Sequence, residues 1–200
     1  MKTEPAGLKT GIVLASNSPG RRHVLEREGI AFTVVPSEGV EEMMDASVPV
    51  EEMVVRNALA KAREVASRAK GGIILGADTV VCCGNKLIGK PKGRNDAEKI
   101  LLELSGKWHE IITGIALVDA AGGKAVSGVG KTRIRFRKLN AAEVRHYIDT
   151  GEWEGKAGGY AIQGKGSALI EKWEGSFTNA IGLPVEKLPE LEKELGGKKA

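Results

Sequence analysis

One carboxylate stands in an apolar strand, where it could do chemistry. Asp78 follows the run Ile73-Ile74-Leu75-Gly76-Ala77 and precedes Thr79 and two valines. Burying a carboxylate is costly unless the group is paired, hydrogen-bonded or bound to a metal. Asp78 is therefore either a turn or capping aspartate after a glycine, or a reactive group that residues from elsewhere in the chain surround.

Residues near the start of the sequence are suited to binding an anion. The apolar run 11–15 ends at Ser16-Asn17-Ser18-Pro19-Gly20-Arg21-Arg22. Ser18 before Pro19 is typical of a helix start, because the hydroxyl caps the helix and proline fits its first position. The free backbone N–H groups of that helix start, together with Arg21 and Arg22, predict a phosphate site. A capped helix without a ligand would show the same pattern.

Acidic residues and a lysine could complete such a site. Glu38, Glu41 and Glu42 follow the second predicted strand. They form either a solvated loop or a set of oxygen ligands for Mg²⁺ or Mn²⁺. Lys61 lies one residue off the apolar face of the longest predicted helix. Periodicity alone therefore favours a Lys61 side chain that points to solvent, although it could also reach into a site.

The stretch 154–166 is dense in glycine and lysine, so its backbone can approach a ligand closely. Its lysines offer ammonium groups to phosphate. Gln163 carries the donors and the acceptor that are needed to read the edge of a nucleobase. The alternative for Gln163 is a polar strand residue without a ligand.

The elements that would position these groups follow from apolar periodicity. We predict strands at 11–15 and 32–35, which a helix from Pro19 to Arg27 joins, followed by a helix at 50–69 and a strand at 73–81. A helix at 95–104 with a capping-box spacing comes next, and then antiparallel strands at 108–118 and 124–137. The chain continues with a helix at 143–149 and a final helix with Leu188, Leu191 and Leu195 inside. The first two strands are parallel if the helix between them is a right-handed crossover. The segment 175–184 is predicted to be a turn-rich loop.

Composition and charge are those of an ordinary globular protein. The 200 residues are 42% hydrophobic and 28% charged, with a net charge of +4 and a pI of about 9.0. This length suits one large domain or two small lobes. The positive charge permits an anionic partner. Arg133, Arg135 and Arg137 alternate along one strand, which favours a solvated face over a nucleic-acid surface.

Other reactive side chains are expected to be structural. Cys82 and Cys83 are adjacent, which disfavours a disulfide between them, so we predict two buried strand residues in a reducing compartment. His109 is expected to be a packed strand residue. No apolar run approaches the roughly 18 residues of a membrane span. The first ten residues lack the apolar segment of a signal peptide. We therefore predict a cytoplasmic protein without membrane contact.

Six motifs make the sequence similar to the Maf family of nucleotide pyrophosphatases. They are Leu14-Ala15-Ser16-x-Ser18-Pro19, Gly76-Ala77-Asp78-Thr79-Val80-Val81, Gly89-Lys90-Pro91, Thr113-Gly114, Tyr160-x-Ile162-Gln163-Gly164 and Gly182-Leu183-Pro184. The resemblance covers residues 11–195 and implies one domain over residues 1–200. It also implies an α/β fold with an elongated mixed sheet flanked by helices and two lobes around a nucleotide cleft, similar to inosine triphosphate pyrophosphatases.

The same resemblance implies roles for individual residues. Asp78 becomes the catalytic carboxylate and, with Glu42, a ligand of Mg²⁺ or Mn²⁺; Glu41 is the alternative to Glu42. The positions of Ser18, Arg21, Lys61, Thr79, Lys90 and Gln163 match substrate-binding positions of the family. This reverses the solvent-facing interpretation of Lys61. Thr79 and Gln163 match positions associated with base choice in the branch that resembles dTTP/UTP pyrophosphatases.

The implied reaction is hydrolysis of dTTP, UTP or related nucleotides, modified ones included, to the monophosphate and pyrophosphate. Base choice stays open, with 7-methyl-GTP or CTP as alternatives, because Gly20 stands where many members have arginine. A homodimer is common in the family. Two non-enzymatic hypotheses remain: a regulator of septum formation in cell division, and a basic nucleic-acid-binding module. The sequence contains no P-loop, which argues against an ordinary kinase or motor ATPase.

Overall fold

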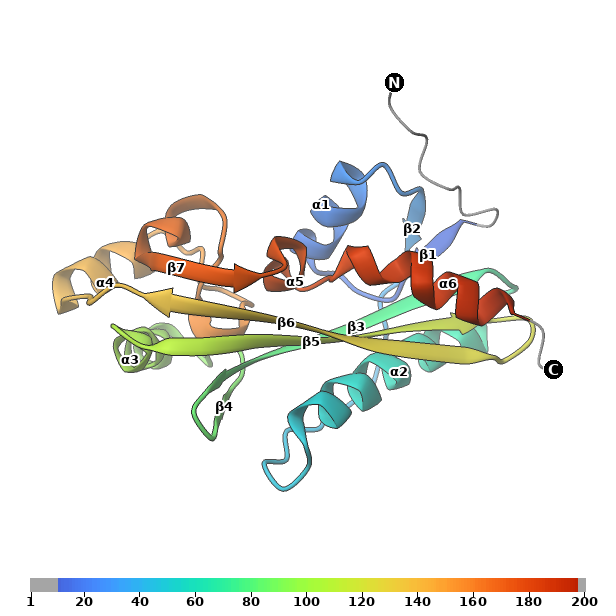
Figure 1. The fold of residues 1–200 in the computed structure, drawn as a ribbon, viewed down its shortest axis with the longest axis horizontal. Helices are drawn as coiled ribbons and strands as arrows, with labels where there is room; N and C mark the ends of the chain where they lie inside the picture. The colour runs from blue at the N-terminus through green and yellow to red at the C-terminus, as the bar shows by residue number, and fades with distance from the viewer. Residues whose placement is uncertain (1–10, 198–200) are drawn as a thin grey trace.

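A long mixed sheet runs through the molecule, with helices on both faces (Figure 1). The structure is a computed structural model that describes residues 11–197. The first ten residues, for which no signal peptide was predicted, lie outside the described residues. Within 11–197 the strand order is β2-β1-β3-β5-β6-β7, and β4 pairs with β3. The predicted α/β class and mixed elongated sheet are confirmed.

The first three elements form a parallel β–α–β unit. They are β1 (Ile12–Leu14), α1 (Pro19–Arg27) and β2 (Phe32–Val34). β1 lies between β2 and β3, parallel to both, as expected if the helix is a crossover. Ser18 caps α1, and its hydroxyl accepts a hydrogen bond from the N–H of Arg21. Gly29 follows the helix with a φ of +69°, a conformation that glycine adopts without strain.

The remaining strands pair with one another antiparallel and carry most of the sheet. They are β3 (Ile73–Cys83), β4 (Lys86–Ile88), β5 (Trp108–Asp119), β6 (Ala125–Phe136) and β7 (Ile170–Gly175). β3 passes through Asp78 without interruption, because each residue from Ile73 to Cys82 has a partner on β5. The interpretation of Asp78 as a turn or capping residue is therefore wrong.

Helices cover the two faces of the sheet separately. α2 (Val50–Arg68) packs its apolar side on one face of β3 and β5. α1 and α6 (Leu188–Gly196) cover the opposite face, where the predicted leucine stripe of α6 is buried. α3 (Arg94–Leu104) and α4 (Ala141–Ile148) lie together at one end of the molecule (Figure 1). Side chains alternate between the faces along each strand, so each face has its own core clusters.

Two local predictions fail for identifiable reasons. α3 begins at Arg94, so Asn95 of the predicted Asn95–Glu98 capping box lies inside the first turn, and the N-cap is Gly93, which has no side chain. The carboxylate of Asp96 accepts the N–H of Lys92, before the helix. The capping box occurs at α4, where Asn140 and Glu143 exchange hydrogen bonds. The segment predicted as a loop contains α5 (Phe177–Ile181), capped by the Ser176 hydroxyl. Short 3₁₀ turns occur at Ala157–Gly159, Gly164–Leu169 and Val185–Lys187.

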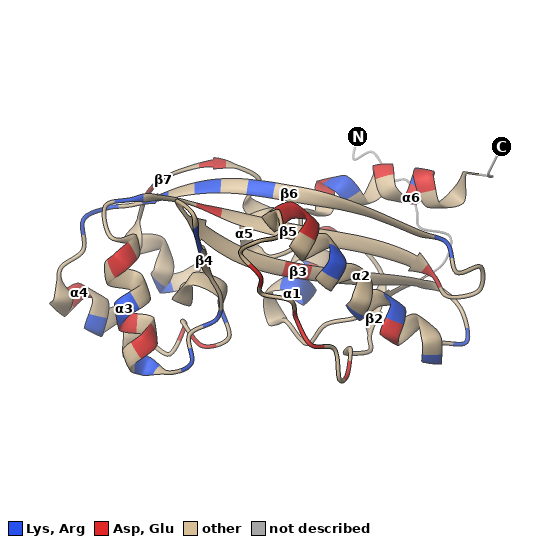
Figure 2. Ribbon diagram, turned by 90° about the horizontal axis from the view of Figure 1, so that it is seen from below, with Lys and Arg blue, Asp and Glu red and all other residues tan. Residues whose placement is uncertain are grey.

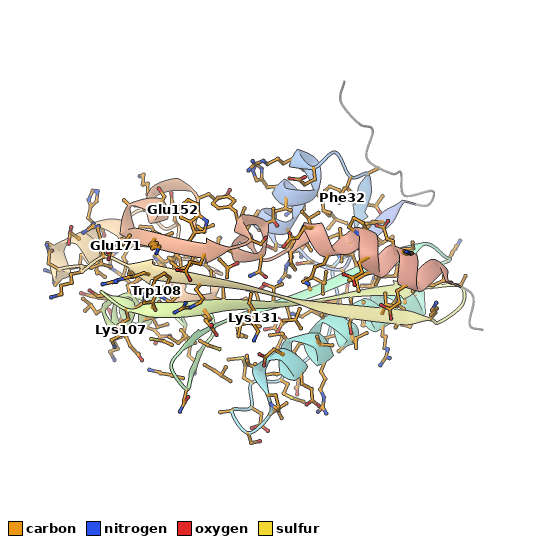
Figure 3. All side chains as sticks on the ribbon, in the orientation of Figure 1. Phe32, Lys107, Trp108, Lys131, Glu152 and Glu171 are labelled. Atoms are coloured by element: carbon orange, nitrogen blue, oxygen red, sulfur yellow. The ribbon has the colours of Figure 1, made fainter. Side chains whose placement is uncertain are left out.

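The arginine row on β6 is an ion-paired surface. Figure 2 shows basic positions along β6 next to acidic positions on β7. Arg133 pairs with Glu174 at 3.0 Å, and Arg135 pairs with Glu171 at 3.2 Å. The Arg133 guanidinium also lies 4.7 Å from the ring centroid of Trp108, at the same end of the sheet as Glu171 (Figure 3). These partners compete with phosphate for the guanidinium groups, which agrees with the predicted solvated face.

The two cysteines lie at the end of β3. Cys82 and Cys83 are half-buried free thiols, more exposed than expected. Burial raises the pKa of Cys82 to about 11, so its thiol stays protonated at neutral pH.

Among the described residues, no helix has the length and apolar character needed to cross a membrane.

His109 is a packed strand residue, as predicted, and it belongs to a buried aromatic cluster. Its ring meets those of Phe136 and Tyr160 edge to face, with centroids 4.9 and 5.5 Å away. Its Nε2 lies 2.7 Å from the Tyr160 hydroxyl. Burial lowers the pKa of His109 from 6.5 to about 4, so the ring is neutral at pH 7.

We expect His109 to make folding stability depend on pH. Because its pKa is about 4 in the folded protein and 6.5 in the unfolded chain, the unfolded chain is protonated first as the pH falls. The unfolding free energy should therefore lose up to about 3 kcal/mol between pH 6.5 and pH 4 from this group. Chemical denaturation at pH 7 and pH 4 measures the loss, which should be smaller by that amount in His109→Gln. An equal loss in both proteins would contradict the prediction.

Candidate active site

A pocket of about 470 Å³ lies at an open edge of β3. β1 pairs with β3 at Ile73–Leu75, and β4 pairs with it at Val81–Cys83. In the described part of the chain, residues 76–80 have no strand partner on that edge. The pocket is within the size range of small-molecule sites. Its lining includes Ser16, Ser18, Arg21, Glu42, Lys61, Asp78, Thr79, Lys90, Lys156, Tyr160 and Gly182.

The open edge explains how two neighbouring residues can share the pocket. Successive side chains of a strand point to opposite faces of the sheet. Asp78 accordingly meets α2 on one face, whereas Thr79 meets Arg21 of α1 and Thr113 of β5 on the other. Because no strand covers this edge, both side chains reach the same cavity.

The centre of the pocket is a lysine held between two carboxylates. Lys61 Nζ donates to Asp78 Oδ1 at 2.6 Å and to Glu42 Oε1 at 2.6 Å. The Lys61 and Asp78 residues are only 7% and 4% exposed, so their charges are largely withdrawn from water. The second oxygen of Asp78, Oδ2, accepts a hydrogen bond of 2.9 Å from Asn57 Nδ2. Both oxygens of the carboxylate are therefore held in a fixed orientation.

Two glycines let α2 come close enough to the sheet to make these contacts. Gly114 lies directly across from Asp78 on β5, and Gly76 lies two residues before it on β3. A Cβ on Gly114 would stand 2.4 Å from the Val54 carbonyl, and one on Gly76 would stand 2.2 Å from the Ala58 carbonyl. The helix backbone thus rests directly on the strands, which places the side chains of α2 on Asp78.

We expect Gly114→Ala to destabilise the protein by about 3 kcal/mol, because its Cβ meets helix backbone that cannot move without displacing α2. The contact between Lys61 and Asp78 should be disturbed as well, since Lys61 moves with the helix. The matched control is Gly128→Ala on β6, whose Cβ would meet only Leu191 side-chain atoms at 3.6 Å and 3.7 Å and Lys187 Cδ at 3.7 Å. Denaturant unfolding compares the two. Equal stabilities of Gly114→Ala and Gly128→Ala would show that α2 can move away from the sheet without a cost in free energy.

Arg21 is anchored at the start of α1 by three of its guanidinium N–H donors. Its Nε donates to the Gly182 carbonyl at 2.9 Å, Nη1 to Ser16 Oγ at 2.9 Å, and Nη2 to Thr79 Oγ1 at 3.2 Å. A guanidinium has five N–H donors, so two remain for a ligand. Burial lowers the pKa of Arg21, and the charges of Asp78 and Glu42 oppose that shift. Arginine nevertheless stays protonated at neutral pH.

Glu42 is the acidic loop residue that reaches the pocket. Desolvation by itself would raise the pKa of Glu42, but the hydrogen bond from Lys61 and the surrounding positive charges outweigh it, so the pKa is lowered. Lys90, at 3.6 Å, is one of those charges. Neither Glu38 nor Glu41 lines the pocket. Among the three acidic residues left open by the sequence, the structure therefore brings only Glu42 to the site.

Some residues singled out in the sequence do not line the pocket. Gln163 lies at the start of a 3₁₀ turn outside the lining, so its role in reading a base stays a prediction. Arg22 donates to the Asn17 carbonyl at 3.1 Å and also lies outside the lining, so of the two arginines in the predicted phosphate site only Arg21 lines the pocket. Of the two lysines in the glycine-rich stretch, Lys156 lines the pocket and Lys165 does not.

Sequence reasoning missed Asn57. This residue stands four positions before Lys61, one turn earlier on the same side of α2, and it is a polar residue next to the apolar position 58. That spacing was the available signal. Among residues 11–197, no three histidine, cysteine or acidic side chains gather as a ready-made metal cluster.

Comparison with known proteins agrees with the motifs. The family model "Maf-like protein" matches residues 11–195. The chain is 45% identical to a dTTP/UTP pyrophosphatase of Syntrophotalea carbinolica, over 96% of this chain and 88% of that one. It is also 45% identical to a dTTP/UTP pyrophosphatase of Gloeobacter violaceus, over 90% and 93%.

A solved dITP/XTP pyrophosphatase of Mycobacterium abscessus is more distant. It has 15% identity and a TM-score of 0.39, over 64% of this chain and 74% of that one. The family match and the curated relatives cover nearly the whole described chain. The chain therefore belongs to the Maf family.

Proposed function

We propose that this protein hydrolyses nucleoside triphosphates of the dTTP/UTP class to the monophosphate and pyrophosphate. The curated relatives with 45% identity carry that activity in their names. The observation that supports the proposal most strongly is the pocket itself. It combines a buried, oriented carboxylate, Asp78, with the cationic groups of Arg21, Lys61 and Lys90.

Asp78 is the proposed catalytic residue. Hydrolysis of a phosphoanhydride needs a positioned water molecule and neutralisation of phosphate charge more than it needs covalent chemistry. A carboxylate whose two oxygens are held by Lys61 and Asn57 can present its lone pairs to a water in a fixed direction. It then orients that water and accepts its proton, a role worth about 10²–10⁴ in rate.

The donor set at the centre of the pocket fits a divalent cation. Asp78 Oδ1 and Glu42 Oε1 each lie 2.6 Å from the same lysine nitrogen, so two carboxylate oxygens already converge on one positive charge. Mg²⁺ is commonly bound by one or two carboxylates together with substrate phosphates. Asp78 and Glu42 are the residues that would hold Mg²⁺ or Mn²⁺. When bound, such an ion neutralises phosphate oxygens and makes water more acidic.

The cationic residues and the helix start are proposed to hold the phosphates. Arg21 keeps two N–H donors free after its contacts with protein groups. Lys90 has a half-exposed side chain at the mouth of the site. Ser18 and Pro19 line the pocket at the start of α1, where helix N–H groups favour an anion. Together they would stabilise the departing pyrophosphate.

Base choice is assigned to Thr79 and Gln163 as a proposal. The Thr79 hydroxyl lies in the pocket, held between Arg21 and Thr113. For Gln163 to read a uracil or thymine edge, its loop has to move toward the pocket. An arginine at position 20, as in many family members, would be crowded here, because its Cβ would stand 3.0 Å from Ile181 Cγ2. A cytoplasmic location and a homodimer also stay predictions.

Pyrophosphate release from a panel of nucleoside triphosphates with Mg²⁺ or Mn²⁺ tests the proposal. We expect dTTP and UTP to be hydrolysed fastest, with release of the monophosphate. A preference for CTP or 7-methyl-GTP would keep the reaction but refute the assigned base. Absence of hydrolysis on every nucleotide, modified ones included, would refute the proposed function.

A further inference from the structure

We propose that Asn57 is a positioning residue that ties the loop carrying Glu42 to Asp78, so that the two carboxylates keep a fixed separation. The inference rests on the proposed function, because its consequence is catalytic. Asn57 is 3% exposed and does not line the pocket, so it acts on the substrate only through other residues. It is held by α2, against the sheet at Gly76 and Gly114.

The Asn57 amide uses both donors and its acceptor. Its Oδ1 accepts the N–H of Met43 at 2.8 Å, and its Nδ2 donates to the Met43 carbonyl at 3.0 Å and to Asp78 Oδ2 at 2.9 Å. The opposite orientation of the amide would place oxygen against two acceptors and NH₂ against a donor. The surrounding groups therefore permit only one orientation.

Asn57 bonds a segment that has no regular secondary structure of its own. Between the end of β2 at Val34 and the start of α2 at Val50, the chain forms no helix or strand. Glu42 lies in this segment, directly before Met43. Both backbone groups of Met43 are bonded to Asn57, which imitates one rung of a sheet. The Met43 side chain also packs on the apolar cluster that contains Met53 and Val80.

Asparagine suits this position because its amide is neutral and has two N–H donors. Aspartate has the same shape and could still accept the Met43 N–H, but it has no donor for Asp78 and would place a second negative charge beside it. Leucine or alanine would leave Asp78 Oδ2 and the Met43 backbone without these partners. Lys61 alone would then link Glu42 to Asp78, through a flexible side chain.

The first test follows the loop without any substrate. Hydrogen exchange is measured for peptides covering residues 40–46 in the wild type, Asn57→Ala and Asn57→Asp. Arg56→Ala is the matched control, since Arg56 is the preceding residue of α2 and forms a surface pair with Glu52. We expect exchange at Met43 to be about 10-fold faster or more in Asn57→Ala, which removes the acceptor of the Met43 N–H, faster by a smaller factor in Asn57→Asp, which keeps an acceptor, and unchanged in the control. Wild-type protection in Asn57→Ala would overturn the anchoring.

The second test is a double-mutant cycle on pyrophosphate release, with Asn57→Ala and Glu42→Gln. We expect Asn57→Ala to lower kcat about 10–100-fold in the wild type, with a much smaller change in KM, and only a few-fold when Glu42 is already replaced. The same factor in both backgrounds would refute the positioning role, since a general loss of stability acts equally in each. If the wild type hydrolyses no nucleotide, the proposed function fails, and loop exchange still decides whether Asn57 anchors the segment.

Discussion

Asp78→Asn is expected to lower kcat for nucleotide hydrolysis by about 10²–10⁴ while the protein stays folded. The amide has the shape of the carboxylate, so the packing around it is kept. It lacks the charge that would bind a proton or a cation. The Lys61 ammonium, 2.6 Å from Asp78 Oδ1 in the wild type, retains Glu42 as a partner. The loss should therefore appear in the rate more than in the stability.

Steady-state pyrophosphate release measures this effect, with the melting temperature as a check of folding. Asp149→Asn is the matched control, because Asp149 is an exposed carboxylate in a surface pair with Arg94. That substitution should leave kcat unchanged. If Asp78→Asn kept more than about a tenth of the wild-type rate, Asp78 would not act as general base, and another group of the pocket would have to be sought.

Lys61→Met is expected to lower both stability and activity. Its side chain and that of Asp78 are 9% and 6% exposed, so the pair is buried, whereas the Glu42 side chain is 37% exposed. Removing one partner of a buried pair leaves the other charge uncompensated, which costs about 3 kcal/mol or more. The two remaining carboxylates would also repel each other. Both effects remove the arrangement that we propose for catalysis.

Denaturant unfolding of Lys61→Met, Asp78→Asn and the double variant measures the coupling. The double variant should be more stable than the sum of the single losses predicts, because no buried charge is then left unpaired. Lys131→Met is the control, since Lys131 forms a half-exposed pair with Glu51 and should cost about 1 kcal/mol or less. Additive losses at Lys61 and Asp78 would show that the two charges do not depend on each other.

Several elements were predictable because their causes are local. The helix start at Ser18 and Pro19 depends on the hydroxyl and the ring of those two residues, and it occurs as predicted. The leucines of α6 repeat at helical spacing, and they are buried. In contrast, the capping box predicted at Asn95 and Glu98 does not form, because α3 begins at Arg94 and its N-cap is Gly93.

The sequence by itself determined most of the strands and helices, without β4, β7 and α5, as well as the family motifs and the side chains available for chemistry. Only the tertiary structure decided which of them meet. Periodicity placed Lys61 toward solvent, yet it is buried, because Gly76 and Gly114 let α2 rest on the sheet beside Asp78. The tertiary structure also brought Asn57 into contact with Asp78 and left Gln163 outside the pocket lining. Periodicity describes one element at a time, whereas the partners of a buried charge come from segments that are distant in the chain.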